Sequence, residues 1–184
     1  GARFRLDRPG LFASLVDDAI GLKKAYKAEK LACPAGSEAE AEAALRYSVA
    51  KTITNSAYGT IGWAYFFLYD EPTAEAVTTL GQVVIKKTQS YLNAKPELDV
   101  IYGDTDSNYV RFPEEWDRAA CIRRAEAHVS ILNEEVYPAV ADEWIDEYDE
   151  CLFEIELESY AETFFQAGKK KRYAQRVTWK DGKE

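Results

Sequence analysis

The chain of 184 residues has no methionine and one histidine, and its three cysteines stand far apart at positions 33, 121 and 151. Such cysteines suit neither a disulfide framework nor a Cys-x-x-Cys zinc site, so they favour a reducing compartment. The longest apolar run, residues 61–69, is too short for a membrane helix of about 20 residues. The charged first residues lack the apolar stretch of a signal peptide. We expect a cytoplasmic chain without membrane partners that begins inside a longer protein.

Apolar residues and charge are plentiful but unevenly placed. Hydrophobic residues make up 47% of the chain, enough for a packed core, which excludes a wholly disordered protein. The formal net charge is −9, yet residues 168–184 carry seven cations against two acids. An acidic body with a basic end favours binding of a polyanion at that end. A soluble acidic protein with a lysine-rich edge is the simpler alternative.

The first half of the chain predicts two helices. Apolar residues recur at helical spacing from residue 11, and the same stripe continues onto Lys23 and Lys27, so a helix over 11–31 has an apolar-to-cationic face. A Pro-Ala-Gly break follows, and Ser37 with Glu40 forms a capping box for a second helix that runs to about Tyr58, with Gly59 as its C-terminal stop. Two helices joined by so short a turn predict an antiparallel helical hairpin.

The second half mixes helices and strands. The pattern predicts a helix over 71–95, short strands over 98–103 and 108–112, and a helix over 114–147 that is interrupted near Pro138. Alternation at period two predicts further strands over 153–158, 164–165 and 172–179. Because helices and strands are segregated, the expected fold class is α+β with an antiparallel sheet and packing helices.

The run Tyr-Gly-Asp-Thr-Asp-Ser at 102–107 places Asp104 and Asp106 at a turn between two strands. Paired carboxylates repel each other unless a cation lies between them, and oxygen ligands favour Mg²⁺. A turn with solvated acids is one alternative. A calcium loop over 104–115 is another, but Tyr109 occupies its glycine position and Pro113 intrudes.

Two further groups of residues suit phosphate binding. Lys51, Asn55 and Tyr58 share one helix face, where a cation, an amide and a ring match a triphosphate, a sugar and a base. A helix end with a packed tyrosine would look the same. The second group is a run of cations beside an aromatic residue, which suits a phosphate backbone, a localisation signal or a charged edge strand: Lys170, Lys171, Arg172 and Tyr173.

These three motifs, in this order and at these separations, resemble those of family B DNA polymerases. The resemblance covers nearly the whole chain and implies a fingers helical hairpin at 10–60 and a palm portion at 61–184 that carries the Asp-Thr-Asp turn. The stretch from Phe164 to Ala174 is similar to archaeal members, especially those of halophiles. The family has another metal-binding aspartate on an upstream strand, and no such motif occurs here.

The resemblance implies a role for each motif residue. Asp104 and Asp106 become catalytic carboxylates that bind two Mg²⁺ ions, with Mn²⁺ as an alternative. The implied dNTP-binding residues are Lys51, Asn55, Tyr58, Lys23 and Lys27, and the implied DNA-binding residues are Lys170, Lys171, Arg172 and Tyr173. Lys23 and Gln82 stand where relatives have arginine, so a bidentate grip on phosphate is absent at Lys23.

The implied activity is template-directed nucleotidyl transfer from dNTPs to a primer 3′-hydroxyl, in replication or repair. The implied partners are primer–template DNA, dNTPs, the rest of the polymerase and a sliding clamp, at the nucleoid. Without the upstream aspartate, the chain is expected to be inactive alone. Two rival hypotheses remain: a non-catalytic cation-binding module on residues 104–115, and a sugar-nucleotide transferase that uses Asp-x-Asp with Mn²⁺.

Overall fold

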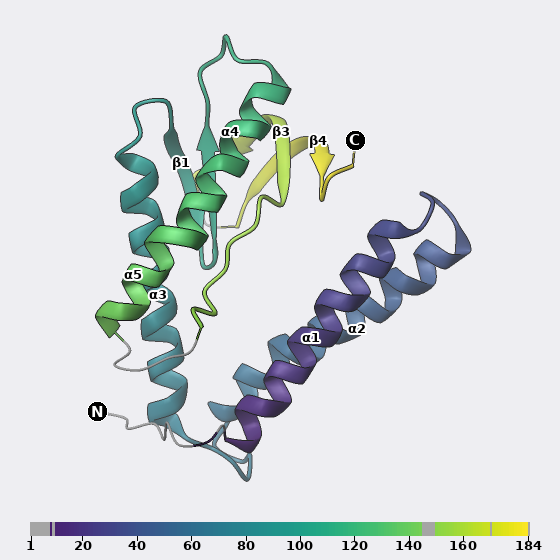
Figure 1. The fold of residues 1–184 in the computed structure, drawn as a ribbon, viewed down its shortest axis with the longest axis vertical. Coiled ribbons are helices and arrows are strands. Elements are labelled where there is room, and N and C mark those ends of the chain that lie inside the picture. The colour runs from purple at the N-terminus through teal and green to yellow at the C-terminus, as the bar shows by residue number, and fades with distance from the viewer. Residues whose placement is uncertain (1–7, 9, 145–149, 170, 184) are drawn as a thin grey trace. The chain divides into compact units, whose positions relative to one another are not determined.

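The structure is a computed structural model that describes residue 8 and residues 10–144, 150–169 and 171–183 (Figure 1). It divides into two compact units, Gly1–Thr79 and Leu80–Glu184, which we describe separately. Within these described ranges, every helix is too short or too polar to cross a membrane.

The first unit is built on two long antiparallel helices, α1 (Leu11–Ala32) and α2 (Glu38–Ile61), which lie side by side (Figure 1). The Ser37 hydroxyl accepts a hydrogen bond from the Glu40 amide at 3.1 Å, and the Glu40 carboxylate accepts one from the Gly36 amide at 2.6 Å. The first bond satisfies an amide that the first turn of the helix leaves without a partner, and the second ties the residue before the cap to the same turn. The predicted helical hairpin and its cap are therefore confirmed.

The end of α2 differs from the prediction. The helix continues through Gly59 to Ile61, and Gly62 follows it. Glycine is a poor helix former but does not forbid the helix, and here the longer helix buries Ile61. The Thr60 hydroxyl also donates to the Ala57 carbonyl at 2.7 Å, which keeps the last turn closed.

Helix α3 (Glu71–Asn93) begins in the first unit and ends in the second. In the second unit it packs with α4 (Arg118–Ile131) and α5 (Tyr137–Trp144) around a hairpin of β1 (Asp99–Asp104) and β2 (Ser107–Arg111) (Figure 1). The core of this unit contains Leu92, Leu98, Leu132 and Tyr137. The Tyr137 hydroxyl lies 2.8 Å from that of buried Thr88 on α3, so its polar end is satisfied as well.

A single wide turn, η1 (Leu132–Val136), separates α4 from α5. Pro138 has no N–H to donate, so a regular α-helical bond is lost near the predicted interruption. In η1 the Tyr137 amide donates to the Leu132 carbonyl, five residues back. Residues five apart on an α-helix point about 140° apart. The wider turn instead allows both Leu132 and Tyr137 to face the core, where each is only 2% exposed. Residues 145–147 of the predicted helix lie outside the described ranges.

A second antiparallel hairpin consists of β3 (Ser159–Gln166) and β4 (Tyr173–Lys180). The α+β class with antiparallel pairing is therefore confirmed, with the strands of the described residues in two separate two-stranded sheets.

The strand predicted over 153–158 is wrong. The chain is extended there, and Phe153 and Ile155 pack against the core while Glu154 and Glu156 are exposed. No strand pairs with this segment in the described structure. Instead, the Asn133 side chain donates to the Ile155 carbonyl at 3.0 Å and accepts from the Ile155 amide at 2.9 Å. The alternating burial of this segment results from packing of every second side chain on the core, and not from hydrogen bonding to a neighbouring strand.

Candidate functional site

The carboxylate turn, residues 104–107, closes the β1–β2 hairpin. Asp104 ends β1 and pairs with Ser107, the first residue of β2. One carboxylate oxygen of Asp104 accepts hydrogen bonds from the Thr105 amide at 3.0 Å and the Thr105 hydroxyl at 3.2 Å, which fixes the orientation of the group. Asp106 lies exposed at the tip. The turn thus holds one carboxylate in place and leaves the other accessible.

The donor set of this turn fits Mg²⁺ but does not complete its coordination. Mg²⁺ in phosphoryl-transfer sites uses one or two carboxylates together with waters and substrate phosphates. Searched as a whole, the described part of the chain contains no group of three or more metal-ligating side chains. The calcium-loop alternative is wrong, because Asn108 and Tyr109 lie in β2, paired with Gly103 and Tyr102 rather than in a loop.

A side chain of α3 lies beside Gly103, next to the carboxylate turn. A Cβ atom at this position would lie 2.7 Å from the side-chain nitrogen of Gln89 on α3, which is the end of a flexible side chain and could move aside. The side-chain oxygen and nitrogen of Asn108, directly opposite Gly103, are buried without a hydrogen-bond partner among the described atoms. The strand before Asp104 thus has the Gln89 side chain of α3 beside it.

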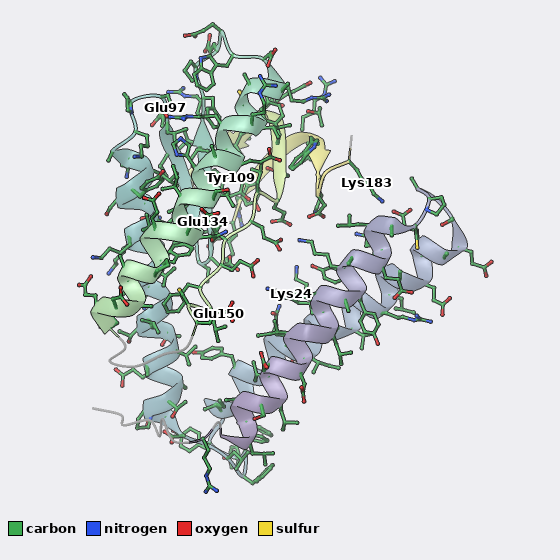
Figure 2. All side chains as sticks on the ribbon, in the orientation of Figure 1. Lys24, Glu97, Tyr109, Glu134, Glu150 and Lys183 are labelled. Carbon is green, nitrogen blue, oxygen red and sulfur yellow. The ribbon has the colours of Figure 1, made fainter. Side chains whose placement is uncertain are left out.

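An aromatic cluster joins the two hairpins of the second unit. It consists of four rings whose paired centroids lie 5.0–5.9 Å apart: Tyr102, Tyr109, Phe164 and Tyr173. The Tyr109 hydroxyl (Figure 2) donates to the Tyr173 hydroxyl at 2.9 Å. Burial, followed by this hydrogen bond, raises the pKa of Tyr109 above its ordinary value. The cluster therefore fixes β3–β4 against the strand that ends in Asp104.

The basic turn, residues 167–169 with 171 and 172, connects β3 to β4. The Ala167 amide donates to the Arg172 carbonyl at 2.9 Å, and the Arg172 amide donates to the Lys169 carbonyl at 3.2 Å. Lys171 has a φ of 64°, in the left-handed region that favours glycine, and its amide donates to the Tyr102 hydroxyl at 3.0 Å. Of the four residues predicted to bind DNA, Arg172 and Tyr173 are exposed, Lys171 is anchored to β1, and Lys170 lies outside the described residues.

The α2 polar row, Lys51, Asn55 and Tyr58, lies on the exposed surface of the first unit. On a helical wheel this row and the apolar side chains Val49 and Ile53 fall on opposite sides of buried Ala50. Lys51 and Asn55 have no interaction partner among the residues that the structure describes. A ligand of the row would therefore meet a cation and an amide that are not already engaged.

An ion pair between the two helices shows which residues of α1 lie beside which residues of α2. Arg46 on α2 bonds Glu29 on α1 at 3.2 Å. Antiparallel helices rise equally per residue in opposite directions, so Lys51, five residues after Arg46, lies level with residue 24 of α1. Lys23 is therefore close to the level of Lys51, and both Lys23 and Lys27 are half-buried beside α2. The hairpin therefore brings Lys23 and Lys27 to about the level of Lys51, while Asn55 and Tyr58 lie about one and two turns further along α2.

Two contributors to the site were not predicted. Tyr102 belongs to the motif around Asp104, and alternation along a strand indicates that both side chains project from the same face. That signal was available in the sequence. Nothing in the sequence signals that Tyr102 meets Lys171, 69 positions away, or that Tyr109 meets Tyr173.

Comparison with known proteins identifies the family to which this chain belongs. The family model described as DNA polymerase family B matches residues 5–182, almost the entire chain. The chain belongs to the family B DNA polymerases. The predicted resemblance is thus confirmed, while the halophilic origin stays a prediction.

Relatives of this family B chain come from archaea, eukaryotes and viruses. It is 30% identical over 141 residues to DNA polymerase 2 of Aeropyrum pernix, covering 76% of this chain and 17% of that protein. It is 30% identical over 166 residues to the DNA polymerase of Archaeoglobus fulgidus, covering 88% and 20%. The DNA polymerase alpha catalytic subunit of Trypanosoma brucei brucei is 36% identical over 100 residues, covering 54% and 7%.

A solved structure has the same fold. The family B DNA polymerase from Pyrobaculum calidifontis matches with a TM-score of 0.62 and 23% identity, covering 95% of this chain and 20% of that one. The chain spans about a fifth or less of the length of each of these relatives.

Proposed function

We propose that this family B chain supplies the Asp-Thr-Asp turn of the palm and the cationic helices of the fingers to a DNA-directed DNA polymerase. The fingers portion corresponds to residues 10–60 and the palm portion to residues 61–184. The observation that carries the proposal is the junction of the carboxylate turn with the basic turn, through the 3.0 Å hydrogen bond between Lys171 and Tyr102. The carboxylates that would bind metal ions and the lysine and arginine side chains that would bind phosphates thereby lie on two hairpins that this hydrogen bond joins.

Asp104 and Asp106 would hold the divalent ions of the reaction, Mg²⁺ or Mn²⁺. Two such ions, when bound, lower the pKa of a primer 3′-hydroxyl and neutralise the leaving pyrophosphate. The chain's own contribution is orientation: Thr105 holds one carboxylate oxygen of Asp104, and Asp106 remains accessible at the tip. Fixed charges of this kind need no rearrangement when the reaction occurs.

The two cationic regions have separate tasks in this proposal. Lys51 binds the triphosphate of the incoming dNTP with Asn55 beside it, and Tyr58 packs near the new base pair. Lys23 and Lys27 add charge from α1, each as a point charge rather than a bidentate group. The basic turn, with Lys171 and Arg172, holds the phosphate backbone of primer–template DNA together with Lys170 and with Tyr173 at the start of β4.

The partners follow from this division. They are primer–template DNA, dNTPs, the remaining parts of the polymerase and a sliding clamp, with the nucleoid as the place of action. Because the described residues offer only a pair of carboxylates at the turn, we expect the 184 residues alone to extend no primer. Mixing the chain with the upstream part of its polymerase should restore extension if that part supplies the missing ligand.

The deciding experiment replaces Asp106 by Asn in the full-length polymerase that contains this chain. Single-nucleotide incorporation should fall about a thousandfold or more, equivalent to about 4 kcal/mol of barrier, because a metal ligand is lost. Affinity for primer–template should stay nearly unchanged, since Asp106 contacts no duplex phosphate in the proposal.

Asp99→Asn is the matched control. Asp99 is an exposed carboxylate at the other end of the same strand, paired with Arg111 at 2.6 Å. Its replacement should leave incorporation within a few-fold of the unaltered enzyme, as exposed ion pairs contribute little. Incorporation by Asp106→Asn within tenfold of the unaltered polymerase would refute the assigned role.

A further inference from the structure

Tyr102 connects two parts of the second unit that are 69 positions apart in the sequence. Its side chain is almost fully buried, and its ring lies 5.5–5.9 Å from the rings of Tyr109, Phe164 and Tyr173. The hydroxyl at the end of this buried ring accepts the Lys171 amide. A side chain of the carboxylate-bearing strand thus reaches the backbone of the basic turn.

The backbone at Lys171 needs such a partner. A left-handed conformation costs a non-glycine residue about 1–2 kcal/mol and persists only where its surroundings impose it. Among the described residues of the turn, the other backbone bonds involve the amides of Ala167 and Arg172 rather than that of Lys171. The hydrogen bond to the Tyr102 hydroxyl therefore stabilises the left-handed conformation of Lys171.

Tyr102 is also fixed relative to the carboxylate turn. It precedes Asp104 by two residues on β1, so both side chains project from the same face of the strand. A movement of this face would shift Asp104 and the anchor of the basic turn together.

We propose that Tyr102 is a positioning residue: its hydroxyl sets the conformation of the basic turn and so fixes the turn's cations relative to the Asp104–Asp106 pair. This inference rests on the proposed function, because it assumes that the basic turn binds a phosphate backbone. Tyr102 itself touches neither metal nor nucleic acid in the proposal.

The same cluster contains a matched control. Tyr109 is also a tyrosine with a hydrogen-bonded hydroxyl, but it donates to the Tyr173 side chain rather than binding the backbone of the basic turn. Tyr102→Phe and Tyr109→Phe each remove one oxygen and keep the ring. Only Tyr102→Phe should release the turn.

The first measurement is amide hydrogen exchange at Lys171 in the 184-residue chain. The Lys171 amide should be protected in the unaltered chain and in Tyr109→Phe, and should exchange about tenfold faster in Tyr102→Phe, as expected when a hydrogen bond of about 1.4 kcal/mol is lost. This measurement requires no polymerase activity. An unprotected Lys171 amide in the unaltered chain would overturn the inference even if the Tyr102 variant failed to fold.

The second measurement is the affinity for a labelled primer–template duplex over a range of salt concentrations, by fluorescence anisotropy. Tyr102→Phe should weaken binding about three- to tenfold and reduce the salt slope by about one phosphate contact. Combining it with Lys171→Ala should weaken binding less than the two single losses added together, because both changes disable one contact. Tyr109→Phe removes a side-chain contact of Tyr173 but keeps the Lys171 amide bond, so it should weaken binding less than Tyr102→Phe does.

Steady-state kinetics of the full-length polymerase then separates positioning from general damage. Tyr102→Phe should raise the KM for primer–template several-fold and leave the KM for dNTP unchanged. Equal duplex affinity of Tyr102→Phe and the unaltered chain, or additive losses in the double variant, would overturn this inference alone. Failure of the unaltered polymerase to bind the duplex would instead overturn the proposed function.

Discussion

The α1–α2 hairpin and the unit built on β1 and β2 are stabilised by different means. Helix α1 has no buried residue within its bounds, and α2 buries only Ala43, Ala50 and Ile61. An open apolar groove of about 370 Å³, lined by residues such as Leu22 and Leu45, remains on the hairpin surface. In the other unit, large side chains fill the core, and Leu132 and Tyr137 are almost fully buried.

Because of this difference, the two parts of the proposed site should respond differently to mutation. Lys51 is exposed on the surface of a long helix, so replacing it changes charge with little effect on packing. The carboxylate turn and the basic turn instead extend from a core and an aromatic cluster, where one lost atom disturbs several neighbours. Mutations should therefore separate binding defects from folding defects more cleanly in the hairpin than in the β unit.

The largest contrast is expected for Leu132→Ala and Leu45→Ala. The first removes a fully buried side chain and should lower the free energy of unfolding by about 2–5 kcal/mol. The second removes one that is 66% exposed and should change it by about 0.5 kcal/mol or less. Urea denaturation followed by circular dichroism measures both. Similar losses for the two variants would contradict the proposed difference in packing.

A second contrast concerns the two cationic regions in the full-length polymerase. Lys51→Ala should raise the KM for dNTP about tenfold and lower kcat, because negative charge grows on the leaving group during the reaction. Lys171→Ala should weaken primer–template binding and reduce its salt slope by about one. The opposite pattern, with Lys51 affecting only the duplex and Lys171 only dNTP, would refute the assigned tasks.

A smaller effect is expected at the start of α2. Ser37→Ala removes the acceptor of the Glu40 amide and should destabilise the hairpin by about 1 kcal/mol. Thr52→Ala is the control, since its hydroxyl only donates to the Ser48 carbonyl within the exposed part of the helix. Thermal midpoints should fall for Ser37→Ala and stay equal or rise for Thr52→Ala. Equal decreases in the two thermal midpoints would show that the Ser37 cap does not stabilise the hairpin more than the Thr52 hydroxyl does.

The smallest effect is a pH dependence from the β unit. Burial, followed by the nearby Arg124 charge, lowers the pKa of His128, while Glu97 opposes the shift (Figure 2). The groups around this ring are Tyr91, Glu97, Arg124 and Lys95. The unfolded chain therefore binds a proton at His128 more readily than the folded chain does. The contribution of neutral, buried His128 to the free energy of unfolding is complete above about pH 6.5 and is lost as the pH falls towards the pKa of the folded state.

Thermal midpoints between about pH 7.5 and pH 5.5 test this sign. The midpoint of the unaltered chain should fall with acidification more steeply than that of His128→Gln, which cannot titrate. The chain has no other histidine, so the difference between the two slopes reports this residue. A steeper decrease in His128→Gln would contradict the direction of the shift.

Local signals predicted much of the fold. Ser37 and Glu40 indicated a helix start that the structure confirms, and the β1–β2 hairpin follows from short strands around Asp104 and Asp106. These features depend on neighbouring residues, whose spacing the sequence states directly. The motif residues also follow from the sequence, although their proposed roles await experiment.

Other features depend on partners far away in the sequence. Residues 153–158 alternate as a strand does, but the chain there packs on the core and bonds Asn133. The bond from Lys171 to Tyr102 joins a turn and a strand whose patterns contain no mutual signal. Period and spacing describe which face is buried, and they do not identify what covers it.

The wide turn at Leu132–Val136 makes the length of this segment significant. Removing one residue there would rotate all of α5 by about 100° around its axis, since each helical residue contributes that angle. Tyr137 would turn away from Thr88, and polar side chains would enter the core in its place. Homologous sequences should therefore exchange residue types within this turn far more readily than they gain or lose a residue, and an engineer should treat its length as fixed.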